Sequence, residues 1–160
     1  AMLSEKVDLF SVGTNDLAQD LLATDRDDSH GAARFEVPHR ALLQALHLIV
    51  DQAHRAGKPV TVCGEIAGDP AIALVLLGMG FDALSMGPAV LPKVKAAIRG
   101  ANSIFLRDAA NEALRCRTKT DIEQLLRMVR TRLVETASLN HRNADSVGPA
   151  AQADRTSIKV

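Results

Sequence analysis

The chain has 160 residues and a formal net charge of zero, with 19 acidic and 19 basic side chains. This balance argues against a general nucleic-acid footprint, which needs a basic excess, and the absence of Trp and Tyr removes the usual platform for stacking bases. Hydrophobic residues make up 47% of the sequence, so a packed core is expected. No apolar run reaches the roughly 18 residues needed to cross a membrane. The two cysteines, Cys63 and Cys116, fit a reducing cytosol better than a single disulfide, which stays open as the alternative.

Short apolar runs predict β-strands, and the amphipathic stretches between and after them predict helices. The strands are expected at 7–12, 59–63 and 81–85, and the helices at 15–23, 38–56, 70–77, 88–99, 102–116 and 120–137. Gly78 is expected to end the third helix, while Thr120 and Glu123 show a capping-box pattern for the last one. Strands separated by helices indicate βα units and a parallel sheet.

This order of elements predicts an α/β fold of three βα units followed by terminal helices. A closed barrel needs eight such units, so we expect either a small open sheet or the final part of a barrel whose beginning lies elsewhere. Residues 1–139 form the predicted domain. Beyond Leu139 the pattern is lost and polar residues, Gly and Pro dominate, so 140–160 are predicted to be a disordered tail.

Polar groups occur where each of the first two strands ends. Gly13-Thr14-Asn15-Asp16-Leu17 follows the first strand, and Cys63-Gly64-Glu65-Ile66-Ala67-Gly68-Asp69-Pro70 follows the second. In a barrel of alternating strands and helices, this edge holds the active site. An amide, a carboxylate and a thiol at one edge suggest an anionic ligand, a metal ion and a proton transfer.

These motifs resemble the C-terminal, phosphoenolpyruvate (PEP)-binding domain of enzyme I, the PEP-protein phosphotransferase of the bacterial sugar phosphotransferase system. Pyruvate phosphate dikinase and PEP synthase share that domain. The resemblance covers about residues 5–137 and runs in family order through 7–17 with Gln19, 25–26, 63–70, 76–82 and 84–86. It implies a (β/α)8 TIM barrel, of which this chain carries the last three βα units plus terminal helices. The run from Cys63 to Pro70 looks more like enzyme I than like the dikinases.

The resemblance implies transfer of a phosphoryl group from PEP, with Mg²⁺, to a histidine in a separate N-terminal domain. That histidine passes the group to a histidine phosphocarrier protein, and pyruvate is the product. A homodimer formed through this domain and a cytoplasmic location in sugar transport are implied as well. The family's second metal carboxylate and several arginines lie on earlier strands, so the isolated chain is expected to have little or no activity. The alternatives are a fragment of a dikinase or synthase, or a non-catalytic dimerisation module.

Two candidate site residues follow the first strand. Asp16 matches the family's metal-binding aspartate, and a carboxylate is a ligand that Mg²⁺ prefers. The alternative is an ordinary acidic residue that the helix dipole favours at a helix N-terminus. Asn15 matches an asparagine that contacts the substrate, and its alternative is a plain helix N-cap.

Two further candidates complete the predicted site. Arg26 matches an arginine that binds the phosphate, and its alternative is a solvated charge in an acidic loop. Cys63 matches the catalytic cysteine that exchanges a proton with the substrate's methylene carbon, as a general acid does. Its alternative is a small buried residue at a strand end. Glu65, Ser85 and Met86 also follow strand ends and are weaker candidates for lining the site.

Overall fold

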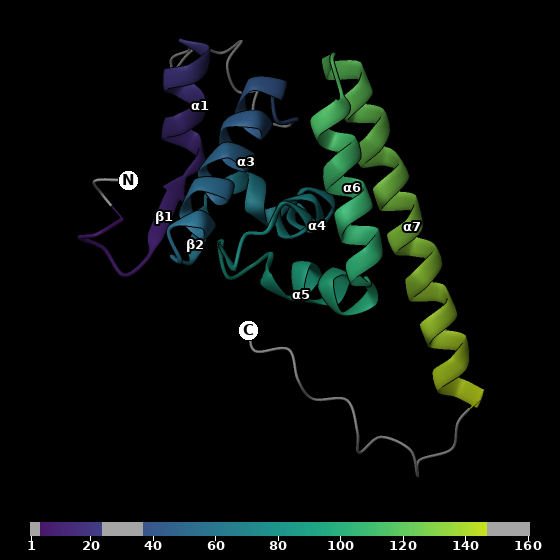
Figure 1. Ribbon diagram of the computed structural model, residues 1–160. Helices are drawn as coiled ribbons and strands as arrows, with labels where there is room; N and C mark the ends of the chain where they lie inside the picture. The colour runs from purple at the N-terminus through teal and green to yellow at the C-terminus, as the bar shows by residue number, and fades with distance from the viewer. Residues whose placement is uncertain (1–3, 24–36, 147–160) are drawn as a thin grey trace.

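The computed structural model describes residues 4–23 and 37–146. A three-stranded parallel sheet of order β1-β2-β3 is formed by β1 (Phe10–Gly13), β2 (Val60–Cys63) and β3 (Ala83–Ser85). The helices are α1 (Thr14–Leu22), α3 (Arg40–Arg55), α4 (Pro70–Met79), α5 (Leu91–Gly100), α6 (Ser103–Arg115) and α7 (Lys119–Ser146), and a 3-10 turn η1 (Glu65–Gly68) precedes α4 (Figure 1). The predicted α/β class with a parallel sheet is confirmed. Within the described residues the sheet is open, so the closed barrel is not seen.

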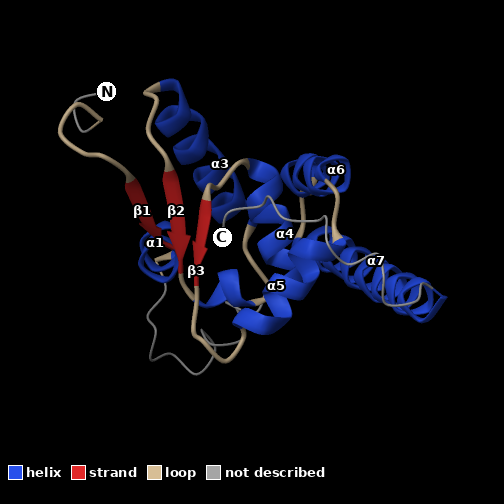
Figure 2. Ribbon diagram, turned by 90° about the horizontal axis from the view of Figure 1, so that it is seen from below, coloured by secondary structure: helices blue, strands red, loops and turns tan. Residues whose placement is uncertain are grey.

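The three strands end at the same edge of the sheet. Gly13 is the register partner of Cys63 on the neighbouring strand, and Cys63 is the partner of Ser85 on the next. The arrows in Figure 2 accordingly run in one direction. The carboxyl ends of β1, β2 and β3 therefore present their last residues side by side.

The two faces of this sheet differ in burial. Val60 and Val62 are fully buried at 0% exposure, and Val12 packs against the same core, so this face meets the helices. Side chains alternate along a strand. The other face, here called the open face, is exposed or partly exposed among the described residues and carries Ser11, Gly13, Thr61, Cys63, Ala83 and Ser85. Parallel sheets are normally covered on both faces. An open face of small and polar residues therefore indicates a surface that contacts another protein segment or a ligand.

The helix α4 lies at the centre of the fold, between the sheet and the helices that follow it (Figure 1). It contacts α5, α6 and α7, and it is apolar around its whole circumference, as a helix buried on all sides must be. Asp69 begins it as the N-cap, accepting hydrogen bonds from the N–H groups of Ala71 and Ile72, and Pro70 occupies the first turn as the sequence predicts.

Gly78 does not end α4, which corrects the sequence prediction. The helix continues through Met79 and is capped by Gly80, which has a positive φ of 105°. Gly78 lies where α6 crosses α4, and a Cβ atom at that position would overlap the backbone carbonyl of Leu106. The missing side chain therefore serves a close helix–helix approach, and the next glycine supplies the left-handed residue that closes the helix.

The start of α7 also differs from the predicted capping box at Thr120 and Glu123. The Thr118 hydroxyl accepts the N–H of Asp121 at 3.1 Å, and the Asp121 carboxylate accepts the N–H of Thr118 at 2.9 Å. This reciprocal pair is a capping box two residues upstream of the predicted one. Hydrogen bonds from Thr118 and then Arg117 hold the pKa of the Asp121 carboxyl below its ordinary value. The helix runs to Ser146, past the predicted end at 137, so residues 140–146 are helical and not part of a disordered tail as predicted. Residues 147–160 lie outside the described part.

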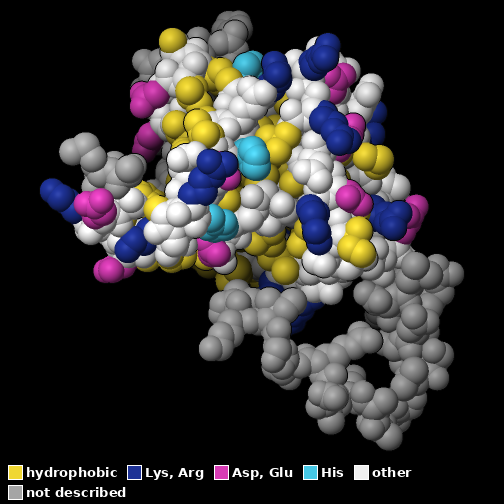
Figure 3. Space-filling model, viewed as in Figure 1, with side chains coloured by type: hydrophobic (Ala, Val, Ile, Leu, Met, Phe, Trp, Pro, Cys, Tyr) yellow, Lys and Arg dark blue, Asp and Glu magenta, His cyan; other side chains and the backbone are white. Residues whose placement is uncertain are grey.

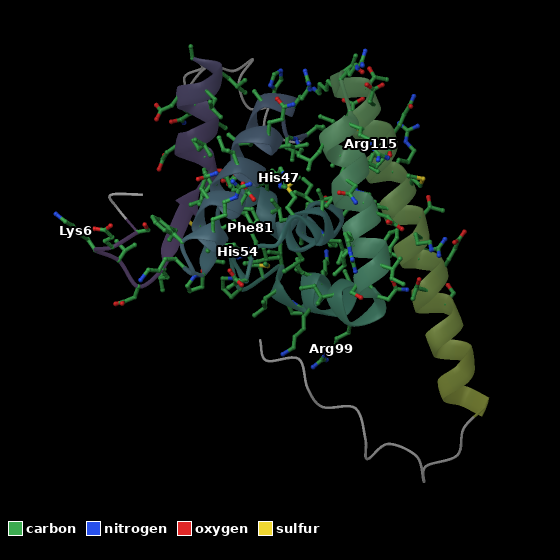
Figure 4. All side chains as sticks on the ribbon, in the orientation of Figure 1. Lys6, His47, His54, Phe81, Arg99 and Arg115 are labelled. Atoms are coloured by element: carbon green, nitrogen blue, oxygen red, sulfur yellow. The ribbon has the colours of Figure 1, made fainter. Side chains whose placement is uncertain are left out.

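Asp82 joins α3, β2 and the start of β3 at the edge opposite the strand ends. Its carboxylate accepts the N–H of Val60 at 2.8 Å and lies 3.0 Å from Nε2 of His54, while its own N–H donates to the Val60 carbonyl. His54 lies near Phe81, the residue before Asp82, in Figure 4. Partial burial raises the pKa of the Asp82 carboxyl, but the bonds from His54 and Val60 outweigh it, and the net pKa lies below its ordinary value.

The surface of the described residues carries both signs of charge. Lys and Arg side chains are interspersed with Asp and Glu across the face shown in Figure 3, in keeping with the zero net charge of the chain. In the described part of the chain, no helix combines the length and the apolar character that a membrane crossing demands.

The glycine at the crossing of α4 and α6 gives a first prediction. Helix propensity alone would make Gly78→Ala stabilising by about 1 kcal/mol. Because the new methyl group would overlap the Leu106 backbone, we expect a net loss of about 1–3 kcal/mol in the free energy of unfolding, measured by urea denaturation. Gly87→Ala is the matched control, since a Cβ atom there meets nothing within 4 Å. Equal stability of the two variants would contradict the crossing geometry.

Asp82 gives a second prediction, about pH. A carboxylate whose pKa is lowered by folding contributes stability at pH values above its ordinary 3.8, and this contribution is lost as the pH falls through the folded-state value. Between about pH 5 and pH 3, the free energy of unfolding should therefore fall more steeply for the wild type than for Asp82→Asn. Asp108→Asn, on the exposed side of α6, is the control. Parallel curves for the wild type and Asp82→Asn would exclude the role given to Asp82.

Candidate active site

The ends of β1 and β2 are tied together by a side-chain hydrogen bond. Thr14, the first residue of α1, is 1% exposed and donates its hydroxyl to the backbone carbonyl of Cys63 at 3.1 Å. A partly buried carbonyl at a strand end is stabilised by such a partner, because a buried acceptor without one is costly. The bond fixes the start of α1 against the residue that carries the thiol.

Gly64 explains why the motif has a glycine directly after Cys63. Its φ of 135° lies in a region that residues with a side chain rarely adopt, and a Cβ atom there would overlap the Thr14 hydroxyl. The same Cβ position lies 3.2 Å from Oδ1 of Asn15. The Asn15 amide therefore lies over Gly64, immediately beside the residue that bears the thiol.

Asn15 and Asp16 occupy the first turn of α1. The N-cap of this helix is Gly13, which has no capping side chain, so the interpretation of Asn15 as an ordinary N-cap is wrong. Within the described residues, neither side chain makes a hydrogen bond or ion pair, which leaves their polar atoms available to a ligand. The position of Asp16 in the first turn also agrees with stabilisation by the helix dipole, so both interpretations of Asp16 remain.

Cys63 lies on the open face of the sheet and is a partly exposed residue. The Sγ–H donates to the carbonyl of Val12 at 3.4 Å, and the hydroxyl of Ser11 donates to the sulfur at 3.9 Å. Both cysteines are free, which rules out the disulfide between them in this structure. Cys63 is therefore not the small buried residue that was its alternative interpretation. Cys116 is the buried cysteine: it is 7% exposed, and burial raises the pKa of its thiol. Cys63 is thus a thiol placed where a ligand can reach it.

The weaker candidates take different positions. Ser85 ends β3 beside Cys63 and is exposed, so it belongs to the same edge, whereas the side chain of Met86 packs partly against the hydrophobic core. Glu65 is exposed at the start of η1. Arg26 lies outside the described residues, so its predicted phosphate contact stays a prediction.

The second half of the long motif is structural. Gly68 approaches Val90 closely, with 3.0 Å from an ideal Cβ position to its Cγ2 atom. Asp69 caps α4 and also accepts a hydrogen bond from Arg130 of α7 at 2.9 Å, which ties the two helices. Residues 66–70 therefore hold the strand end in place. The polar side chains of the two motifs that bond no other described residue are Asn15, Asp16 and Glu65, and Cys63 keeps a partly exposed thiol.

The arrangement can bind an anion and donate a proton beside it. Amide N–H groups at the first turn of α1 and the Asn15 side chain can donate to anionic oxygens, and the thiol can act as a general acid. No group of three or more His, Cys, Asp or Glu side chains in the described residues could hold a metal by itself. Asp16 alone fits one ligand position of a hard cation that takes its other ligands from a bound substrate or from elsewhere.

Thr14 gives a prediction for this site. Thr14→Val keeps the shape of the side chain but leaves the partly buried Cys63 carbonyl without its side-chain donor, so we expect a loss of about 1–3 kcal/mol in the free energy of unfolding, measured by urea denaturation. Thr61→Val makes the same change on the open face of β2, where the hydroxyl bonds no described residue. The tie between the strand ends would be refuted if the two variants unfolded at the same urea concentration.

Comparisons with known proteins point to one family. The sequence profile described as "PEP-utilising enzyme, PEP-binding domain" matches residues 1–103. Multiphosphoryl transfer protein 2 of Escherichia coli K12 is 38% identical over 126 residues, which are 79% of this chain and 15% of that protein. The phosphoenolpyruvate-protein phosphotransferase of Haemophilus influenzae is 39% identical over 124 residues, 78% of this chain and 22% of its own length. The protein of that name from Cupriavidus necator is 46% identical over 109 residues, 68% of this chain and 19% of its own length.

The matched residues contain the whole sheet and both strand-end motifs, whereas α7 lies beyond the profile match. The chain spans between 15% and 22% of the length of these three relatives. The family match thus covers the segment in which the thiol, the amide and the carboxylate come together, and the chain belongs to the PEP-utilising enzymes, matching their PEP-binding domain.

Proposed function

We propose that this chain forms the C-terminal part of an enzyme I-like PEP-protein phosphotransferase. The observation that carries the proposal is the meeting of Asn15, Asp16 and Cys63 at the aligned ends of β1 and β2. Relatives that are named phosphoenolpyruvate-protein phosphotransferase or multiphosphoryl transfer protein favour this activity over a dikinase or a synthase. The three strands with their helices would be the last three βα units of a (β/α)8 barrel. The remaining strands would pair with the open edges of the sheet and enclose its open face.

The proposed chemistry divides among the three residues. The Asn15 amide donates to an oxygen of PEP and orients it beside the sulfur. When the phosphoryl group leaves for an acceptor histidine, the three-carbon product is the enolate of pyruvate. The Cys63 S–H bond then breaks, its proton forms a C–H bond at the methylene carbon, and the electron pair stays on sulfur, giving pyruvate and a thiolate. Arg26 would hold the phosphate through a planar fork of donors.

Asp16 is the proposed ligand for Mg²⁺. Its carboxylate is exposed at the sheet edge and has no partner among the described residues, which suits a hard cation that keeps most of its ligands outside the protein. When bound, the metal supplies charge neutralisation for the phosphate oxygens. A second carboxylate and further arginines would come from earlier strands of the barrel.

Because these groups act together, we propose that the isolated 160 residues are nearly inactive. The acceptor would be a histidine in an N-terminal domain, and the next acceptor a histidine phosphocarrier protein. A homodimer formed through this domain and a cytoplasmic location in sugar transport complete the proposal.

The proton-transfer role is tested in a chimera. Residues 1–137 of this chain replace the aligned segment of the Haemophilus influenzae relative, and the incorporation of deuterium into the methyl group of pyruvate is followed by NMR. Cys63→Ala should slow this exchange by about 10²-fold or more, because the general acid is removed. Phosphorylation of the phosphocarrier protein from PEP is measured in the same samples.

Cys116→Ala is the matched control, since this buried thiol lies at the C-terminal end of α6, where it bonds the Glu112 carbonyl, and its loss should leave the exchange at the chimera's own rate. Exchange at the unmodified rate in Cys63→Ala would remove Cys63 from the mechanism. Asp16→Asn, which keeps the shape but not the charge, should raise the Mg²⁺ concentration needed for half-maximal rate, and an unchanged requirement would exclude Asp16 as a metal ligand.

A further inference from the structure

We propose that Ser11 is a positioning residue for Cys63, an inference that rests on the proposed role of Cys63 as the proton donor. Ser11 lies on the open face of β1, and its hydroxyl donates a hydrogen bond to the Cys63 sulfur at 3.9 Å. The sequence motif drew attention only to the residues after the strand, whereas this contact comes from a residue inside it.

The register of the strands makes the contact specific. Gly13 is the register partner of Cys63, and Ser11 is two residues earlier on the same face, diagonally across from the sulfur. The contact joins the two side chains directly, with 3.9 Å between the Ser11 hydroxyl oxygen and the Cys63 sulfur. Thr61 and Ser85 also lie on this face, yet neither hydroxyl bonds the sulfur, so Ser11 is its single side-chain donor among the described residues.

The sulfur has two partners of opposite kind. The Val12 carbonyl accepts its S–H at 3.4 Å, and Ser11 donates to it. Both bonds suit the neutral thiol. Once the proton has moved to the enolate carbon, the sulfur carries the electron pair and a negative charge and has nothing to donate to Val12, whereas the Ser11 hydroxyl still donates to it. A hydrogen bond to a charged acceptor is stronger than one to a neutral group.

Ser11 thus acts on two properties of the reaction. It fixes the direction of the thiol on the open face, and it stabilises the thiolate that forms in the step that makes pyruvate. Both effects belong to the chemical step and neither involves a contact with the substrate. Loss of the hydroxyl should therefore lower kcat for pyruvate exchange and leave KM unchanged.

The contact itself is tested on the chain of 160 residues, where it can be measured whatever the chain catalyses. Cys116 is replaced by Ala so that Cys63 is the single thiol. The rate of alkylation by iodoacetamide near pH 8 reports the reactivity of the sulfur, because the thiolate is the nucleophile. Ser11→Ala should slow alkylation by about two- to tenfold, the range expected for one hydrogen bond. Ser11→Thr keeps the hydroxyl and should restore the rate, and Thr61→Val, on the same face without a bond to sulfur, should leave it unchanged.

The outcomes separate this inference from the proposed function. An alkylation rate that is unchanged or faster in Ser11→Ala, or equally slowed in Thr61→Val, would overturn the positioning role whether or not the chimera is active. Slower alkylation in Ser11→Ala with rescue by Ser11→Thr supports it, even if the chimera exchanges no deuterium and the proposed function fails. In an active chimera, Ser11→Ala should lower kcat by about the same two- to tenfold at constant KM, and a rise in KM at constant kcat would contradict the assignment.

Discussion

The hydrogen bond from the Thr14 hydroxyl to the Cys63 carbonyl joins two segments that are 49 residues apart in the chain. It depends on parallel strands that end in register and on a glycine at position 64 that leaves room for the hydroxyl. The first turn of α1 is consequently held against the end of β2. The placement of an amide and a carboxylate beside a thiol is thus a consequence of backbone packing that is already complete before any ligand binds.

The strand-end motifs carry both structural and chemical information. Ile66 and Ala67 are buried, and Gly68 approaches Val90. The Asp69 carboxylate caps α4 by accepting two backbone N–H groups, and it also accepts a hydrogen bond from Arg130. Within the two motifs, Asn15, Asp16 and Glu65 keep polar side chains that bond no other described residue, and Cys63 keeps a partly exposed thiol. A sequence match through these motifs therefore reports the architecture first, and the chemistry depends on the few residues left over.

Sequence reasoning succeeded where a local rule determines the structure. Asp69 followed by Pro70 starts α4 as capping rules require, and the apolar spacing of α3 predicts its buried face. It failed where a distant neighbour decides. Gly78 ends no helix, and Leu106 of α6 occupies the space that a side chain there would need. The cap of α7 was misplaced for a different reason: Thr118 and Asp121 form a local capping box that competes with the one predicted two residues later.

The site was predicted in the same uneven way. Asn15, Asp16 and Cys63 could be located because they follow strand ends, and the register then brought them together. Ser11 was missed, although alternation along β1 places it on the same face as the thiol once the register is known. The contact of Asp82 with His54 joins residues 28 positions apart, at the end of α3 and just before β3, and no local sequence pattern predicts it.

The central claim is that the edge formed by β1 and β2 is one ligand site. A crystal structure of the chimera with Mn²⁺ in place of Mg²⁺ and a PEP analogue, in which a methylene group replaces the bridging oxygen, tests it most directly. We expect the analogue to contact Asn15, with its terminal vinyl methylene carbon, not the bridging one, facing the Cys63 sulfur. The anomalous signal of the metal should lie at Asp16. An analogue bound elsewhere, such as the cavity of about 480 Å³ between α5 and α7, with Asn15 and Cys63 untouched, would contradict the account.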